Sequence, residues 1–156
     1  MSRQSTFKHE EADDSAGFLL WKITVLWQKK LSTVLDRFKI TQTQYAILAS
    51  LRWFEERNEP LKQSHLAEHT KIDKMTLSKA IRMLEKNGLV LRKKSVRDSR
   101  ATDVFFTPQG KKITEKAIVA IEKADDEFFA CLTIKTLIEY KTFTKVIIST
   151  NDSASN

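Results

Sequence analysis

"HLAEHTKIDKMTLSKAIRMLEKNG", residues 65–88, is the stretch that decides the fold. It contains two short segments with helical spacing of apolar residues, separated by a turn. Asp73 stands where it can cap the second helix, and Gly88 stands where it can end it. Leu66 and Ala67 are expected to pack against the second helix, which crosses close to the small alanine. Two short helices joined in this way predict a helix–turn–helix.

The second helix of this pair, residues 73–88, has an apolar face and a basic face. At about 100° per residue, the inward side chains are Leu77, Ala80, Ile81, Leu84 and Asn87. The outward side chains are Met75, Ser78, Lys79, Arg82 and Lys86. This outward face lacks acidic residues and suits a major groove, where cations meet phosphates or guanine edges and apolar groups meet thymine methyls. The alternative is an ordinary amphipathic surface helix.

The next stretch, residues 89–107, has β-branched and aromatic residues at both ends and a charged middle. This pattern predicts a hairpin with a solvated tip, which after a helix–turn–helix forms a wing. Arginines at the tip, Arg97 and Arg100, are expected to reach the narrow, negative minor groove. Asp98 is expected to hold the Arg100 guanidinium in one rotamer. The alternative is a solvated loop whose charges keep an edge strand from aggregating.

The chain upstream of this region is helical in pattern. Residues 17–38 carry an apolar arc so wide that more than one partner surface must cover it. Residues 40–56 predict a further helix, with Thr41 and Gln44 spaced as a capping box. Pro60 breaks the chain after that helix.

The chain downstream of the wing is also helical in pattern. Pro108 is placed in the first turn of a long helix, with Thr107 as its N-cap. The pattern continues to about Thr150, with a bend expected near residues 131–133, where β-branched residues cluster. The remaining six residues, "NDSASN", predict a disordered tail.

The composition is that of a soluble globular chain, with 41% hydrophobic and 30% charged residues in 156. No run approaches the roughly 18 apolar residues of a membrane-spanning helix, and the polar N-terminus is not a signal peptide. A single cysteine, Cys131, fits a reducing compartment. We therefore expect a cytoplasmic protein with no membrane partner.

The net charge of +7 is concentrated in one part of the chain. Residues 71–100 hold ten basic and three acidic residues, which leaves +7 in that stretch and no excess elsewhere. Such a concentration is typical of a surface that binds a polyanion, above all nucleic acid. A solvated charge run is the alternative.

Three stretches resemble the MarR family of bacterial transcription regulators. They are "ITQTQYAIL" (40–48), "HLAEHTKIDKMTLSKAIRMLEKNGLVLRK" (65–93) and "DSRATDVFFTPQGKKI" (98–113). The third contains the family's wing pattern, D-x-R followed by a strand that ends in threonine and a nearby glycine. The resemblance covers about residues 18–150 and implies a mainly α-helical fold with a small β-wing. The family's turn usually has a glycine where this chain has Lys71.

The resemblance implies a homodimer that binds double-stranded DNA at a pseudo-palindromic operator. The implied organisation is a flexible polar N-terminus (1–16), dimerisation helices (17–38 and 108–150), a winged helix–turn–helix DNA-binding region (39–107) and a disordered tail (151–156). The family positions place Lys74 and Thr76 among the DNA contacts as well. The complete predicted DNA-binding set is Lys74, Met75, Thr76, Ser78, Lys79, Arg82, Lys86, Arg97, Asp98 and Arg100.

The resemblance also implies repression that a small aromatic or phenolic effector relieves. Trp21, Tyr45, Trp53 and His65 are the candidates to line an effector pocket, although each is more often a simple core residue. The family's peroxide-sensing branch has a reactive cysteine near the start of the first helix, where this chain reads "SAGFLLW". Cys131 is expected to pack in the dimer core, so redox sensing is disfavoured.

The sequence leaves two alternatives to DNA binding. A winged helix can bind protein instead, but the all-basic outward helix face argues against that function. "HLAEH" (65–69) matches the H-x-x-E-H pattern of inverted zinc proteases, with two histidines on one helix face. The sequence offers no clear third ligand, so a zinc hydrolase is disfavoured and neither metal nor cofactor is expected.

Overall fold

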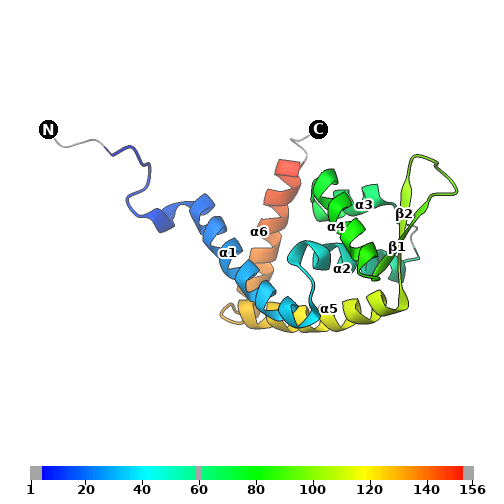
Figure 1. Cartoon of the computed structure of the whole chain (residues 1–156). Helices are drawn as coiled ribbons and strands as arrows, with labels where there is room; N and C mark the ends of the chain where they lie inside the picture. Colours follow the sequence, from blue (N-terminus) through cyan, green and yellow to red (C-terminus); the bar gives the residue numbers. More distant parts are fainter. Residues whose placement is uncertain (1–4, 59–60, 153–156) are drawn as a thin grey trace. The chain divides into compact units, whose positions relative to one another are not determined.

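A computed structural model describes residues 5–58 and 61–152 of the chain (Figure 1). Its contacts divide the chain into two compact units, Met1–Ile121 and Glu122–Asn156, which are described separately below. The elements in chain order are η1 (Ala12–Asp14), α1 (Ala16–Leu35), η2 (Asp36–Phe38), α2 (Gln42–Glu56), α3 (Gln63–Thr70), α4 (Lys74–Lys86), β1 (Val90–Lys94), β2 (Thr102–Phe106), α5 (Pro108–Phe129) and α6 (Ile134–Asp152). The predicted fold class, mainly α-helical with a small β-wing, is confirmed.

The helix starts follow from local sequence. The hydroxyl of Thr41 accepts a hydrogen bond from the Gln44 backbone N–H at 3.1 Å, and the Gln44 side chain accepts from Thr41 N–H at 3.0 Å. This reciprocal pair is the predicted capping box of α2. Asp73 caps α4 and Gly88, with φ of 74°, follows its end, so both predicted boundaries of that helix are confirmed.

The core of the first unit joins all its helices. Its largest fully buried side chains are Leu35, Ile47, Leu48, Leu66, Leu77, Ile81, Leu84, Val90 and Thr114. Leu35 comes from the end of α1, and Ala117 and Ile121 of α5 belong to the same cluster. The predicted division into dimerisation helices (17–38 and 108–150) and a winged helix–turn–helix region (39–107) stays a prediction; in the structure, Leu35 of α1 and Ala117 of α5 pack in the same core as α2, α3 and α4.

The turn between α3 and α4 has a residue with positive φ. Lys71 has φ of 58° and ψ of 18°, the left-handed conformation in which the resembling family usually has glycine. Thr70 supports the turn, because its hydroxyl donates to Leu66 O at 2.7 Å and accepts from Ile72 N–H at 3.3 Å. The turn therefore keeps its shape with a lysine in the strained position.

The wing is an antiparallel hairpin in which Val90 pairs with Phe106 and Lys94 with Thr102. The segment before α3 adds a third backbone contact, because Lys62 forms a bridge with Asp103 and Val104 N–H donates to Leu61 O at 3.2 Å. Pro60, the predicted break, lies outside the described residues.

One junction joins the end of α4, the start of β1 and the start of α5. The Thr107 hydroxyl donates to Gly88 O at 2.6 Å and accepts from Gly110 N–H at 3.0 Å, which confirms Thr107 as the predicted N-cap. Thr107 N–H donates to Leu89 O at 3.1 Å, and Leu89 N–H donates to Leu84 O at 2.9 Å. Helix α4, the wing and helix α5 are thus linked within a few residues.

The start of the chain contains local structure. Ala12–Asp14 form a 3-10 turn and α1 begins at Ala16, whereas the flexibility of residues 1–16 stays a prediction. Asp13 accepts from the Lys22 ammonium at 2.8 Å, which ties this turn to α1. Residues 1–4 lie outside the described part.

The second unit contains the end of α5 and α6. Between them the chain bends at the predicted position, and the Thr133 hydroxyl caps α6 by accepting from Thr136 N–H at 3.1 Å. A disordered tail is predicted from residue 151, but α6 continues through Asp152, and the Asn151 side-chain amide donates to Ile147 O at 2.8 Å. The rest of that predicted tail, residues 153–156, lies outside the described residues. Cys131 is exposed in this single chain.

Apolar side chains stand exposed on α1 and on α6. On α1 they include Leu20 and Trp21, with 64% and 69% of their surface exposed, and on α6 they include Ile134, Phe143 and Ile147. None of the described helices is long and apolar enough to cross a membrane.

Candidate nucleic-acid interface

Helix α4 is the second helix of the helix–turn–helix and is called the recognition helix below. It begins at the Asp73 carboxylate, which Thr76 holds by two hydrogen bonds. One oxygen of Asp73 accepts from Thr76 N–H at 2.9 Å, and the other accepts from the Thr76 hydroxyl at 2.5 Å. These hydrogen bonds lower the pKa of Asp73 below its usual value. Thr76 was predicted to contact DNA, and its hydroxyl proton is already used in this cap.

The outward face of α4 is exposed and basic. Lys74, Met75, Lys79, Arg82 and Lys86 are all exposed, Met75 with 79% of its surface, and Ser78 is half-buried. Lys79, Arg82 and Lys86 make no ion pair with any described residue. Leu77, Ile81 and Leu84 are buried as predicted, whereas Asn87, predicted to turn inward, is exposed at the C-cap.

The one acidic residue of α4 is turned away from this face. Glu85 accepts from Arg92 of β1 three times, from the backbone N–H at 2.8 Å, from Nε at 3.1 Å and from an NH2 nitrogen at 3.0 Å. The hydrogen bonds from the Arg92 side chain have the largest effect, and together with that from the Arg92 backbone N–H they lower the pKa of Glu85. The pair holds α4 to the wing and leaves the outward face without negative charge.

The wing tip differs from the prediction in one respect. Asp98 was expected to hold the Arg100 guanidinium, but its Oδ1 accepts from the Arg100 backbone N–H at 3.0 Å instead. Its Oδ2 faces the Lys62 ammonium at 4.0 Å. The backbone turn at Asp98–Arg100 explains this, because it brings the N–H back onto the carboxylate two residues earlier. Arg97 and Arg100 are exposed and form no ion pair within the described part of the chain.

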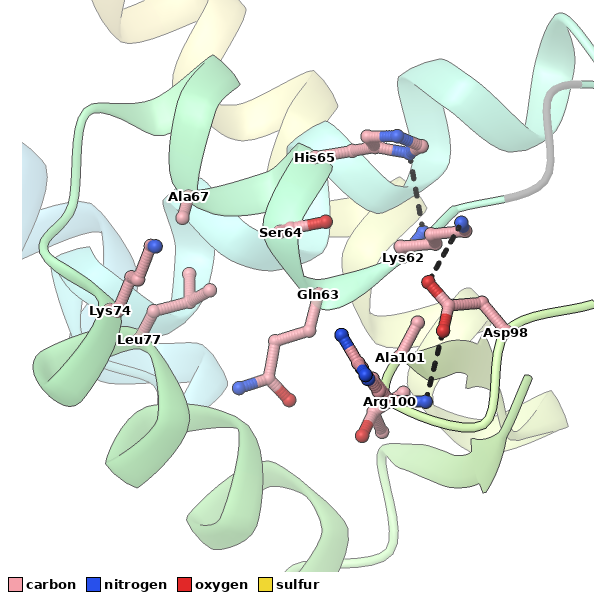
Figure 2. Close-up of a pocket in the computed structure, with 11 residues that line it drawn as sticks. Lys62, Gln63, Ser64, His65, Ala67, Lys74, Leu77, Asp98, Arg100 and Ala101 are labelled. Atoms are coloured by element: carbon pink, nitrogen blue, oxygen red, sulfur yellow. Dashed lines mark hydrogen bonds and ion pairs between the residues drawn. The ribbon is translucent and has the colours of Figure 1, made fainter.

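A pocket of about 400 Å³ lies between α3, the start of α4 and the wing loop (Figure 2). Lys74 lines it from α4 and Arg100 from the wing, so the structure brings these two predicted DNA-binding residues together. Gln63 and Ser64 of α3 also line it, and the predicted set omitted them. Their position in the first helix of the helix–turn–helix could have indicated them, because that helix crosses the DNA backbone.

The four candidate effector residues are dispersed in the described chain. His65 lines the pocket beside the wing, whereas Trp21, Tyr45 and Trp53 do not. Trp21 is exposed on α1, and Tyr45 is half-buried on α2. Trp53 is also exposed, and the Arg57 guanidinium stacks on its ring with 3.3 Å between the guanidinium carbon and the ring centroid.

The two histidines of the H-x-x-E-H pattern have local roles. His65 Nδ1 accepts from Lys62 N–H at 3.4 Å, and the His69 ring packs edge-on against Phe54 with 5.0 Å between centroids. Among the described residues, no three His, Cys, Asp or Glu side chains are grouped to hold a metal ion.

Comparison with known proteins agrees with this geometry. The MarR family model matches residues 40–102. The HTH-type transcriptional regulator YdcH of Bacillus subtilis (strain 168) is 33% identical over 123 residues, which cover 79% of this chain and 84% of that protein.

Solved structures agree in fold. The S. aureus MepR–DNA complex superposes with a TM-score of 0.79 at 21% identity, covering 87% of this chain and 98% of that one. CouR from Rhodococcus jostii RHA1, bound to p-coumaroyl-CoA, has a TM-score of 0.76 at 19% identity and covers 89% and 95%. The matched relatives are named as transcriptional regulators or repressors. With its winged helix–turn–helix and a relative at this identity over most of both chains, the protein belongs to the MarR family of transcriptional regulators.

Proposed function

We propose that this protein binds double-stranded DNA at a specific sequence, with α4 in the major groove and the wing tip in the adjacent minor groove. The observation that carries the proposal is the outward face of α4, where Lys79, Arg82 and Lys86 are exposed and form no ion pair with a described residue, while Glu85 is bound to Arg92. A solvated surface helix has no need to remove its only carboxylate from one face. A DNA-reading helix does, because a carboxylate beside phosphates is repelled.

The rest of the predicted DNA-binding set fits the same arrangement. Arg97 and Arg100 supply guanidinium groups at the wing tip that form no ion pair within residues 5–58 and 61–152, and Lys74 lies across the pocket from the wing. Met75 is positioned for thymine methyl groups and Ser78 for a base edge or phosphate. In this proposal Asp98 shapes the wing and does not itself meet the DNA.

We also propose that the working form is a homodimer acting on chromosomal DNA in the cytoplasm. The exposed apolar side chains of α1 and α6, such as Trp21 and Phe143, need a covering surface, and a second copy supplies one. Two copies related by a twofold axis would place two α4 helices on a pseudo-palindromic operator.

Selection of bound duplexes from random DNA tests the central proposal. A recovered pseudo-palindrome is the expected result, and no enrichment contradicts it. The double variant Arg82→Ala/Arg100→Ala should then weaken binding at least tenfold. A control with the same loss of charge, Lys112→Ala/Lys116→Ala on α5, should change affinity little. If the Arg82→Ala/Arg100→Ala variant binds the duplex as tightly as the wild type and the control variant do, a winged helix that binds protein is favoured.

We further propose that the protein represses transcription and that a small aromatic or phenolic anion releases it from DNA. CouR, which shares the fold, was crystallised with p-coumaroyl-CoA, and this chain carries Trp21, Tyr45, Trp53 and His65 as candidate contacts. The test measures affinity for the selected duplex with a panel of aromatic acids and their thioesters. Tryptophan fluorescence reports binding in the same samples. Affinity that stays constant across the panel contradicts this part of the proposal.

A further inference from the structure

The segment before α3 is attached to the base of the wing by its backbone. Lys62 forms a bridge with Asp103 of β2, and the neighbouring Leu61 O accepts from Val104 N–H at 3.2 Å. Lys62 therefore has a fixed position beside the hairpin, although it is far from the wing loop in sequence. From this position its four-carbon side chain can reach the loop between β1 and β2.

The Lys62 side chain meets that loop at Asp98. The Lys62 Nζ lies 4.0 Å from Asp98 Oδ2, while Asp98 Oδ1 accepts from the Arg100 backbone N–H at 3.0 Å. The carboxylate thus faces α3 with one oxygen and binds the wing backbone with the other. Figure 2 shows these three residues following one another along the edge of the pocket.

The Arg100 guanidinium stays available as a result. The carboxylate two residues earlier is engaged with the backbone and with Lys62, and Arg100 forms no ion pair with a described residue. In Figure 2 the guanidinium points into the pocket toward Gln63. A loop that is already ordered loses less conformational entropy when DNA binds it.

We propose that Lys62 is a positioning residue for DNA binding, which acts through Asp98 to fix the wing backbone at Arg100. This inference rests on the proposed DNA-binding function and adds Lys62, the N-cap residue of α3, to the residues that determine it. Both partners are partly exposed, at 34% and 48% of their side-chain surface, so water and salt weaken the contact. Loss of Lys62 should therefore reduce affinity by about two- to fivefold.

The competing role for Lys62 is direct contact with a DNA phosphate. Salt dependence separates the two roles, because each phosphate contact contributes about one to the slope of log affinity against log salt. A lysine that acts through Asp98 leaves that slope unchanged. Its effect should also depend on Asp98 and on Arg100, which a phosphate contact would not.

The experiment compares Lys62→Met, Asp98→Asn and the double variant on the selected duplex at several salt concentrations. Asp98→Asn removes the charge but keeps an oxygen that can accept from Arg100 N–H. Lys62→Met should weaken binding without changing the slope, and should add nothing in the Asp98→Asn or Arg100→Ala background. Lys62→Arg should restore affinity. Lys111→Met is the matched control, because Lys111 forms an ion pair of similar exposure with Glu55, at 3.3 Å, outside the wing.

Hydrogen exchange at the Arg100 amide of the free protein supplies a readout without DNA. Exchange should become about two- to fivefold faster in Lys62→Met and stay unchanged in Lys111→Met. Unchanged exchange in Lys62→Met overturns the inference, and so does a slope that falls by about one with additive effects. If hydrogen exchange responds to these variants as expected but the protein binds no duplex, the proposed DNA-binding function has failed instead.

Discussion

Replacement of Gly110 by alanine should destabilise the fold severely. Gly110 lies in the first turn of α5, where that helix passes the backbone of Leu89. A Cβ atom at Gly110 would lie 1.8 Å from Leu89 O, 2.6 Å from its carbonyl carbon and 2.8 Å from its Cα. Ordinary contacts between heavy atoms are about 3.5 Å, so the two backbones would have to separate by roughly 1.5 Å.

The surrounding hydrogen bonds oppose that separation. Thr107 N–H donates to Leu89 O at 3.1 Å and the Thr107 hydroxyl donates to Gly88 O at 2.6 Å, so both would stretch or break. Overpacking costs about 1–3 kcal/mol where side chains can move, and each lost hydrogen bond adds about 1 kcal/mol. Because the obstacle is backbone, we expect a loss of about 4 kcal/mol or more, and a melting temperature lower by roughly 10 °C.

The other two glycines of the chain serve as controls. Gly17 has no heavy atom within 4 Å of an added Cβ, so Gly17→Ala should stabilise α1 by about 0.5 kcal/mol. Gly88 has room but a φ of 74°, so Gly88→Ala should cost about 1 kcal/mol. Urea unfolding followed by circular dichroism, at one fixed protein concentration, measures all three. Equal midpoints for Gly110→Ala and Gly17→Ala would refute the close approach of α5 to Leu89.

Three further outcomes are expected. Leu66→Ala should lower the free energy of unfolding by about 2–5 kcal/mol in urea, because the side chain is fully buried; a loss below 1 kcal/mol would contradict this packing. Since the pKa of Asp73 is lowered in the folded chain, its charge stabilises the fold above the unfolded pKa, near 3.8, and that contribution is lost as the pH falls through the lower folded value. The difference in urea midpoint between wild type and Asp73→Asn should therefore be present at pH 7 and shrink below about pH 4, and a difference that grows on acidification has the wrong sign. Lys86→Ala should weaken binding to specific and random duplexes alike and reduce the salt slope by about one, whereas an unchanged slope would remove Lys86 from the phosphate contacts.

Features set by neighbouring residues were predictable from sequence. Thr41 with Gln44, Asp73 with Thr76, and Thr107 with Gly110 are helix starts whose partners lie within three residues. Apolar spacing likewise predicted the inward face of α4, because a regular helix fixes which side chains share a side. Fold class and the recognition helix therefore followed from local patterns.

Features set by distant residues were not predictable. The wing pattern predicts that Asp98 pairs with Arg100, two residues away, whereas its ion pair is with Lys62, which reaches it only after β2 has paired with the segment before α3. The C-terminal end of α6 differs from the predicted position for another reason. Polar composition predicted disorder for residues 151–156, but a helix propagates at small cost once formed, so α6 includes Asp152.

The junction at Thr107 has a mechanical consequence. Gly88, Leu89 and Gly110 are joined there by short hydrogen bonds and by a backbone approach that leaves no space for a methyl group. Because this junction is tightly packed, a rotation of the first part of α5 must carry α4 and the wing with it. In the proposed homodimer, α4 and the wing of each copy would then move as one rigid body. A signal that reaches α5 would alter the distance and angle between the two α4–wing units and leave the shape of each unchanged.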